Sequence, residues 1–157
     1  MRSYICGIFS NDMFSKSCEY AIKAMIFIAQ KSQPETRISI KEIAGGIGAP
    51  EHFIAKILQE LSRKKLLHSI KGPNGGFYLT KADYKTSLAD IVKVMDGDKI
   101  YNVCVLGLKS CSPKNPCPVH DEYKEIKKNL ISMIEKNTIG TFNQKLHSGK
   151  LHLKTRN

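Results

Sequence analysis

Residues 39–50 read Ser39-Ile40-Lys41-Glu42-Ile43-Ala44-Gly45-Gly46-Ile47-Gly48-Ala49-Pro50, and this stretch decides the fold. Ser39 and Glu42 form a capping box, in which a hydroxyl and a carboxylate satisfy the free amides at the start of a helix. The glycines that follow do not sustain a long helix, so we expect a short one over Ile40–Ala44. Pro50 suits the first turn of the next helix, which we expect to run to Arg63. Two short helices joined by a glycine turn predict a helix-turn-helix, with an ordinary helical hairpin as the alternative.

The segment after these helices has the pattern of a β-wing. Short apolar runs at Leu66–Ile70 and Phe77–Thr80 flank the loop Lys71-Gly72-Pro73-Asn74-Gly75-Gly76. Such runs predict two strands, and the glycines let the loop backbone approach a phosphate or enter a minor groove. Because the loop directly follows a helix-turn-helix, these elements together predict a winged helix-turn-helix.

Helical periodicity extends the pattern in both directions. Apolar residues at helical spacing predict a helix over 14–30, and a second capping box, Ser87-Leu88-Ala89-Asp90, starts a helix that Gly97 ends. Between Val119 and Asn137 apolar residues recur in steps of four and three. This seam favours a long helix that packs against a partner helix, with packing against its own domain as the alternative.

The expected fold is therefore mainly α with a small β-wing: a winged helix-turn-helix plus a long dimerisation helix. The expected segments are a flexible N-terminal extension (1–12), the DNA-binding domain (13–97), a cysteine-bearing loop (98–118), the dimerisation helix region (119–142) and a basic flexible tail (143–157).

The charge of the chain favours a polyanionic partner, because cations that neutralise phosphates release condensed counterions. Lysine and arginine number 25 against 14 acidic residues, a net charge of +11, although solubility alone is the alternative explanation. No run approaches the roughly 20 apolar residues of a membrane span, and residues 1–12 lack the cleavage site of a signal peptide. We expect a cytoplasmic protein with no membrane partner, in which cysteines indicate metal or redox chemistry instead of disulfides.

Three cysteines lie close together in the sequence. Cys104, Cys111 and Cys117 are separated by six and five residues, and His120 lies three positions beyond Cys117 in a stretch that contains three prolines. Thiolates suit iron in a cluster, and three thiolates with an imidazole suit zinc equally well. The wide spacing favours a cluster, because zinc sites more often use closer pairs.

The order of these motifs resembles that of the Rrf2 family of bacterial transcription regulators. The residues that carry the resemblance are Phe14–Ile22, Ile38–Ala44, Lys71–Phe77, Leu88–Asp98 and the three cysteines, so it covers roughly residues 13–142. The resemblance implies a homodimer that binds near-palindromic promoter sites on double-stranded DNA. Members of the family often sense iron–sulfur status, nitric oxide or redox state, and some carry no cluster. We expect an iron–sulfur cluster, 2Fe–2S in preference to 4Fe–4S, with zinc as the alternative.

The resemblance offers two candidates for a fourth ligand. His120 stands where the iron–sulfur-assembly type of regulator in this family has its ligating histidine. Glu19 stands where other members use an acidic residue from the first helix of the partner subunit. We favour His120. Cys18 lies on an apolar helical stripe and is expected in the core, and we assign no role to Cys6.

The recognition helix and the wing supply the expected DNA contacts. Glu51, His52 and Lys56 are expected near base edges, where a carboxylate accepts from cytosine and an ammonium donates to guanine. The remaining expected contacts, mostly to phosphates, are Ser39, Arg63, Lys64, Lys65, Lys71 and Asn74.

Three other functions use the same residues differently. An iron–sulfur electron carrier would need the cysteines but neither the wing nor the recognition helix. A metal-dependent hydrolase is disfavoured because the five histidines are scattered, with no carboxylate pattern or nucleophile motif, so we expect no enzyme. A DNA-binding regulator that carries zinc or no metal, or that uses the cysteines only as redox-active thiols, stays open.

Overall fold

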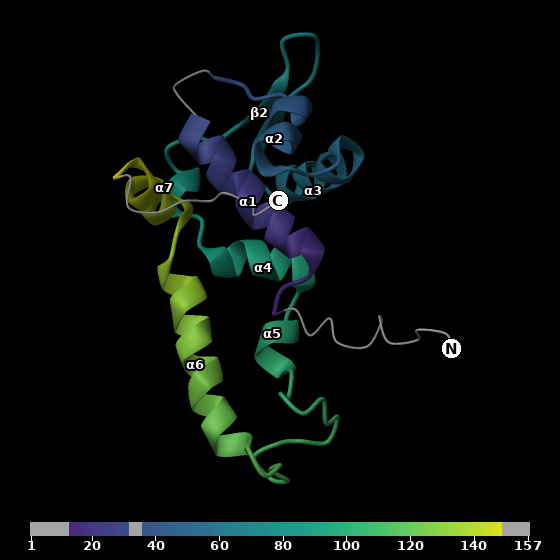
Figure 1. Ribbon diagram of the computed structural model, residues 1–157, viewed down its shortest axis with the longest axis vertical. Helices are drawn as coiled ribbons and strands as arrows, with labels where there is room; N and C mark the ends of the chain where they lie inside the picture. The colour runs from purple at the N-terminus through teal and green to yellow at the C-terminus, as the bar shows by residue number, and fades with distance from the viewer. Residues whose placement is uncertain (1–12, 32–35, 149–157) are drawn as a thin grey trace, which may run out of the picture.

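A computed structural model describes residues 13–31 and 36–148, so the expected extension at 1–12 and the end of the expected tail lie outside the described residues. The winged helix-turn-helix forms one end of the molecule, and α6 and the cysteine loop extend away from it (Figure 1). The fold class is that expected from the sequence. The elements, in chain order, are α1 (Lys16–Lys31), α2 (Ile40–Ile47), α3 (Glu51–Arg63), β1 (His68–Ile70), β2 (Gly76–Tyr78), the 3-10 turn η1 (Asp83–Lys85), α4 (Leu88–Asp96), α5 (Lys99–Asn102), α6 (His120–Lys136) and α7 (Ile139–His147).

Helix α1 is the centre of the fold, because α2, α3, α4 and α7 all pack against it. Its buried stripe includes Cys18, Met25 and Ala29, as the periodicity predicts, and also Ala21, Ala24 and Ile28. The small alanines let neighbouring helices approach closely. The core therefore surrounds α1 on several sides.

Helix α2 is one turn longer than we expected, because it continues through Gly45 and Gly46 to Ile47. Gly48 ends it in the left-handed conformation, with φ of 67°. A Cβ atom on Gly46 would overlap the ring of Phe27 on α1. The Phe27 ring therefore occupies the space that a side chain at position 46 would fill. The packing of α2 on α1 and α3 outweighs the weak helix propensity of glycine.

The wing is an antiparallel pair in which His68 faces Tyr78 and Ile70 faces Gly76. Both strands are shorter than expected. Ile38, which precedes α2, adds a bridge to Phe77: the N–H of each residue donates to the carbonyl of the other at 2.9 Å. The wing is thus hydrogen-bonded to the start of the helix-turn-helix.

Helix α6 coincides with the helical seam expected between Val119 and Asn137. A second helix, α7, follows it and covers the end of the expected dimerisation helix region and residues 143–147 of the expected tail. The chain turns at Asn137 and Thr138, where Thr138 caps α7 by a reciprocal pair of bonds with Thr141. Asn137 O accepts from Leu88 N, and Ile139 N donates to Thr86 O, both at 2.9 Å. These bonds tie the α6–α7 junction to the start of α4, where the expected Ser87–Asp90 capping box is present.

Helix α6 has one face against its own domain and another that is exposed. Ile134 is fully buried and α6 packs on α4, whereas Ile126 and Met133 are 62% and 47% exposed. Within the described ranges, every helix is too short or too polar to cross a lipid bilayer.

Candidate metal centre and nucleic-acid interface

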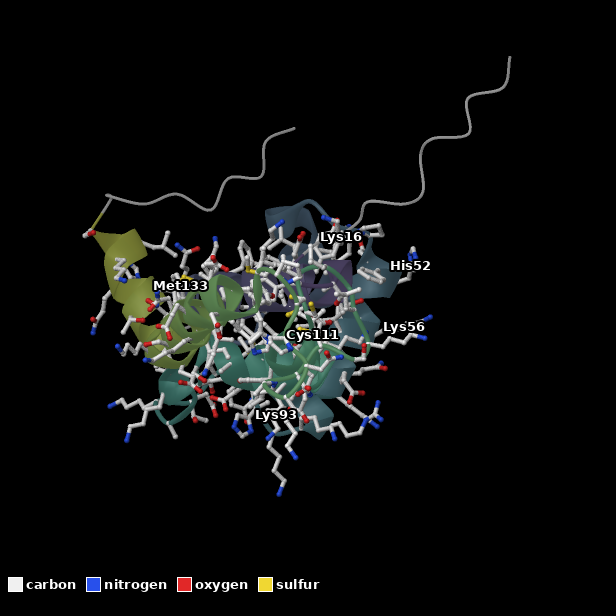
Figure 2. All side chains as sticks on the ribbon, turned by 90° about the horizontal axis from the view of Figure 1, so that it is seen from below. Lys16, His52, Lys56, Lys93, Cys111 and Met133 are labelled. Atoms are coloured by element: carbon white, nitrogen blue, oxygen red, sulfur yellow. The ribbon has the colours of Figure 1, made fainter. Side chains whose placement is uncertain are left out.

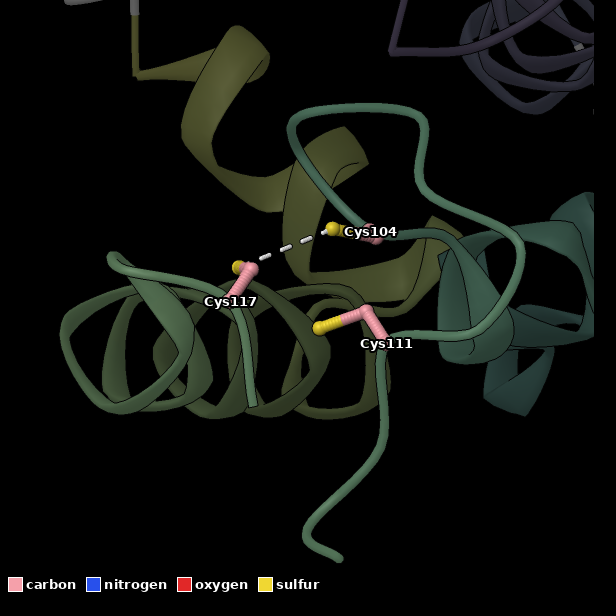
Figure 3. Close-up of side chains that lie close together, drawn as sticks. All are labelled: Cys104, Cys111 and Cys117. Atoms are coloured by element: carbon pink, nitrogen blue, oxygen red, sulfur yellow. Dashed lines mark hydrogen bonds between the residues drawn. The ribbon is translucent and has the colours of Figure 1, made fainter. Parts of the chain in front are cut away.

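The three loop cysteines converge in space. The Sγ atoms of Cys104, Cys111 and Cys117 all lie within 4.8 Å of one another, and the side chains of Cys104 and Cys111 point toward Cys117 (Figure 3). The Sγ atoms of Cys104 and Cys117 are 3.9 Å apart. All three side chains are partly buried. This arrangement offers three soft ligands to one metal centre.

Short turns bring together residues that are distant along the loop. The N–H of Gly107 donates to Cys104 O at 2.9 Å, and Gly107 has a φ of 68°, which favours glycine. Ser112 and Asn115 exchange backbone hydrogen bonds, so the chain reverses between Cys111 and Cys117. These turns bring the three cysteines together without a helix or strand between Cys104 and Cys117.

The surroundings of the thiols differ in their effect on acidity. The backbone N–H groups of Leu108 and Leu106 lower the pKa of Cys104, because they donate hydrogen bonds to its thiolate. The backbone N–H of Cys117 acts in the same direction on Cys111, but burial and the neighbouring sulfurs of Cys117 and Cys104 raise the pKa of Cys111 overall. The backbone N–H groups around Cys104 therefore favour its ionised form.

His120 lies beside this group, at the first residue of α6. Its Nδ1 atom is 3.2 Å from Cys111 Sγ, and its backbone N–H donates to Cys117 O at 3.0 Å. Glu19 instead pairs with Lys16, at 3.1 Å, and within this described protomer it does not belong to the converging group. Cys18 is fully buried in the core, as expected. Cys6 lies outside the described residues.

Helix α3 presents its polar face to solvent. Glu51, His52 and Lys56 are all exposed, and His52 and Lys56 project outward from α3 (Figure 2). Arg63, Lys64 and Lys65 are exposed at the end of the same helix, where Arg63 pairs with Glu60 at 2.8 Å. The opposite face holds Ile54, Ile57, Leu58 and Leu61 in the core.

The wing and the start of α2 hold the other expected DNA contacts. Lys71 and Asn74 are exposed in the wing loop. Ser39 is also exposed, but its Oγ atom accepts from Glu42 N at 3.2 Å and so caps α2. The sequence analysis missed Arg37, whose Nη1 atom donates to Asn74 O at 3.2 Å. The available signal was an arginine two residues before Ser39, the N-cap of α2. It was not sufficient, because its partner Asn74 lies 37 residues further along the chain.

Comparison with known proteins identifies the family. The model of Rrf2, described as an iron-dependent transcriptional regulator, matches residues 14–144. This chain belongs to the Rrf2 family. A relative from Aquifex aeolicus that carries the name of an HTH-type transcriptional regulator is 33% identical over 129 residues, which are 81% of this chain and 88% of the relative. The HTH-type transcriptional regulator NsrR of Bacillus licheniformis is 27% identical over 92 residues, covering 59% of this chain and 64% of NsrR.

Solved structures of other proteins share the fold of this Rrf2 chain. CymR, the global cysteine regulator of B. subtilis, has a TM-score of 0.70 at 24% identity and covers 83% of this chain and 95% of its own. IscR of T. potens has a TM-score of 0.67 at 21% identity, with coverage of 89% and 92%. At these identities the likeness shows the fold alone. The chain is therefore a transcriptional regulator of the Rrf2 type, built on the winged helix fold.

Proposed function

We propose that this Rrf2-family chain is a homodimeric, sequence-specific DNA-binding regulator whose DNA affinity depends on an iron–sulfur cluster held by Cys104, Cys111 and Cys117. The observation that carries the proposal is the convergence of the three thiols within 4.8 Å in the loop that leads into α6. The family description as an iron-dependent regulator supports iron as the metal. The exposed polar face of α3 and the glycine-rich wing support DNA as the partner.

His120 is the proposed fourth ligand. Its Nδ1 atom already lies 3.2 Å from Cys111 Sγ. His120 is also the first residue of α6, the helix proposed to form the dimer interface. An imidazole in place of a thiolate makes that metal bond the one most readily exchanged, which suits a sensor. When bound, the cluster would supply redox and ligand-exchange chemistry at this loop.

A path from the loop to the DNA-binding domain runs through α6. Helix α6 packs on α4, and the α6–α7 junction is hydrogen-bonded to Thr86 and Leu88 at the start of α4. A change in the loop that moves α6 would therefore change how two DNA-binding domains of a dimer are oriented. A modest difference in DNA affinity between two such orientations is sufficient to switch binding.

Zinc is the second candidate, because three thiolates that all lie within 4.8 Å of one another also fit a single tetrahedral ion. Tetrahedral zinc with Zn–S bonds of about 2.3 Å places two thiolates roughly 3.8 Å apart. The 3.9 Å between Cys104 and Cys117 Sγ matches that separation. The same chain would then be a DNA-binding regulator with a structural metal.

Metal analysis of the anaerobically purified protein separates these candidates. Iron and sulfide in equal amounts, with visible absorption that is lost in Cys111→Ala, would support the cluster. Cys18→Ala is the matched control, because Cys18 is buried outside the loop, and it should retain the metal. Zinc without sulfide would contradict the cluster and support a zinc site. A preparation without any metal would contradict both metals and support oxidation of the thiols as the signal.

DNA binding is tested separately, by selecting duplexes from a randomised library with the metal-loaded protein. We expect an enriched near-palindromic sequence that binds more tightly than random duplex. Loss of the metal should then change the affinity for that sequence. Equal affinities of the loaded and metal-free protein for every duplex would rule out metal-dependent regulation while leaving DNA binding intact.

A further inference from the structure

Arg37 stands beside the wing although it precedes α2 in the sequence. The next residue, Ile38, exchanges two backbone hydrogen bonds of 2.9 Å with Phe77 on β2. A Cβ atom on Gly76 would lie only 2.8 Å from Ile38 O, so the backbone segments at Ile38 and Gly76 are in close contact here. The backbone at Arg37 is therefore held against the root of the wing.

The Arg37 side chain reaches from this root to the tip of the wing. Its Nη1 atom donates to Asn74 O at 3.2 Å. Asn74 belongs to a turn that Gly75 N closes by donating to Gly72 O at 2.9 Å. The loop residues from Lys71 to Asn74 are exposed, so few packing contacts hold this segment in place. The hydrogen bond from the Arg37 guanidinium therefore stabilises the position of the wing tip.

A guanidinium has five N–H donors in a planar fork, and a bond to one carbonyl leaves donors for a second acceptor. Arg37 is exposed, and its side chain is hydrogen-bonded to the wing loop that also carries Lys71. We propose that Arg37 holds the wing tip in place and at the same time binds a phosphate of the DNA backbone. This inference rests on the proposed DNA-binding function, and it adds a contact from outside the recognition helix and the wing loop.

The salt dependence of binding to a random-sequence duplex tests the phosphate contact, because such contacts do not depend on sequence. Arg37→Gln should flatten the slope of log affinity against log salt by about 0.9 for each subunit bound. Arg37→Lys keeps the charge and should retain the wild-type slope. Lys93→Gln removes an exposed cation from α4, away from the wing, and should also leave the slope unchanged.

Hydrogen exchange of residues 71–76 in the DNA-free protein tests whether the Arg37–Asn74 hydrogen bond stabilises the wing tip. We expect faster exchange of the Gly75 amide in Arg37→Gln than in the wild type, with no change in peptides from α1. An unchanged salt slope or unchanged Gly75 exchange in Arg37→Gln would overturn the proposal, as would an equal loss of slope in Lys93→Gln. Failure of the selection experiment to enrich a sequence would overturn sequence-specific regulation alone, because the Arg37 effects are measured on random duplex and free protein.

Discussion

Cysteine has two different chemistries in this chain, and the surroundings of each residue decide between them. Cys18 is fully buried on α1, where burial and then the carboxylate of Asp96 raise the pKa of its thiol to about 12. The cysteines of the loop are partly exposed, and backbone N–H groups lower the pKa of Cys104. The same residue type is thus a core hydrophobe at Cys18 and a proposed metal ligand in the loop.

Alkylation of the metal-free, reduced protein at neutral pH should follow this division. We expect iodoacetamide to label Cys104, Cys111 and Cys117 and to leave Cys18 unlabelled, because the thiolate is the reactive form and Cys18 is both protonated and inaccessible. Peptide mass spectrometry gives the extent at each site. Denatured protein is the control, in which Cys18 should react as well. Labelling of Cys18 in the folded protein at the rate of Cys104 would contradict the assignment of Cys18 to the core.

At the scale of one element, helix α2 shows how packing overrides local propensity. Both Gly45 and Gly46 lie inside the helix, yet they have different surroundings. Nothing lies within 4 Å of a Cβ atom built on Gly45, whereas one on Gly46 would overlap the Phe27 ring. Gly46 thus leaves room for the Phe27 ring, whereas Gly45 faces open space.

Alanine substitutions at these neighbouring positions should have opposite effects. Gly45→Ala should raise the free energy of unfolding by about 0.5–1 kcal/mol, because alanine is the better helix former and meets no obstacle. Gly46→Ala should lower it, because the Phe27 ring has to leave its place between α1 and α2. Urea denaturation of the two variants and the wild type measures both changes. Equal stabilisation by the two substitutions would show that the Phe27 contact does not constrain α2.

At the scale of the whole molecule, α6 connects the candidate metal loop to the winged helix and leaves apolar residues exposed on its other face. Ile126 lies on that face, 62% exposed, and lines a cavity of about 600 Å³ with Phe14, Ile100, Val103 and Leu130. Apolar surface of this kind is costly to leave in water. A second copy of the chain, packed along α6, is the occupant that the proposed homodimer requires.

Ile126→Glu should therefore weaken dimerisation, because a charge would have to enter the apolar interface. We expect a rise of about tenfold or more in the dimer dissociation constant, which corresponds to about 1.4 kcal/mol. Light scattering over a range of concentrations measures it. Lys128→Glu, also on α6 and exposed, is the control for added negative charge. A wild-type protein that stays monomeric at high concentration, or an Ile126→Glu variant as dimeric as the wild type, would contradict a dimer built on this face.

The amino-acid sequence alone determined the order of the helices, the wing and the capped start of α4, because periodicity, caps and turn residues act over a few neighbouring positions. It also singled out the loop cysteines and His120, which lie within one short stretch. The longer α2, the anchoring of the α6–α7 junction on the start of α4, and the bond from Arg37 to Asn74 were decided by tertiary structure. Each depends on a contact between segments far apart in the chain, such as Gly46 with Phe27 or Asn137 with Leu88. Local sequence patterns carry no information about such distances, because the free energy of these contacts exists only once the segments have packed together.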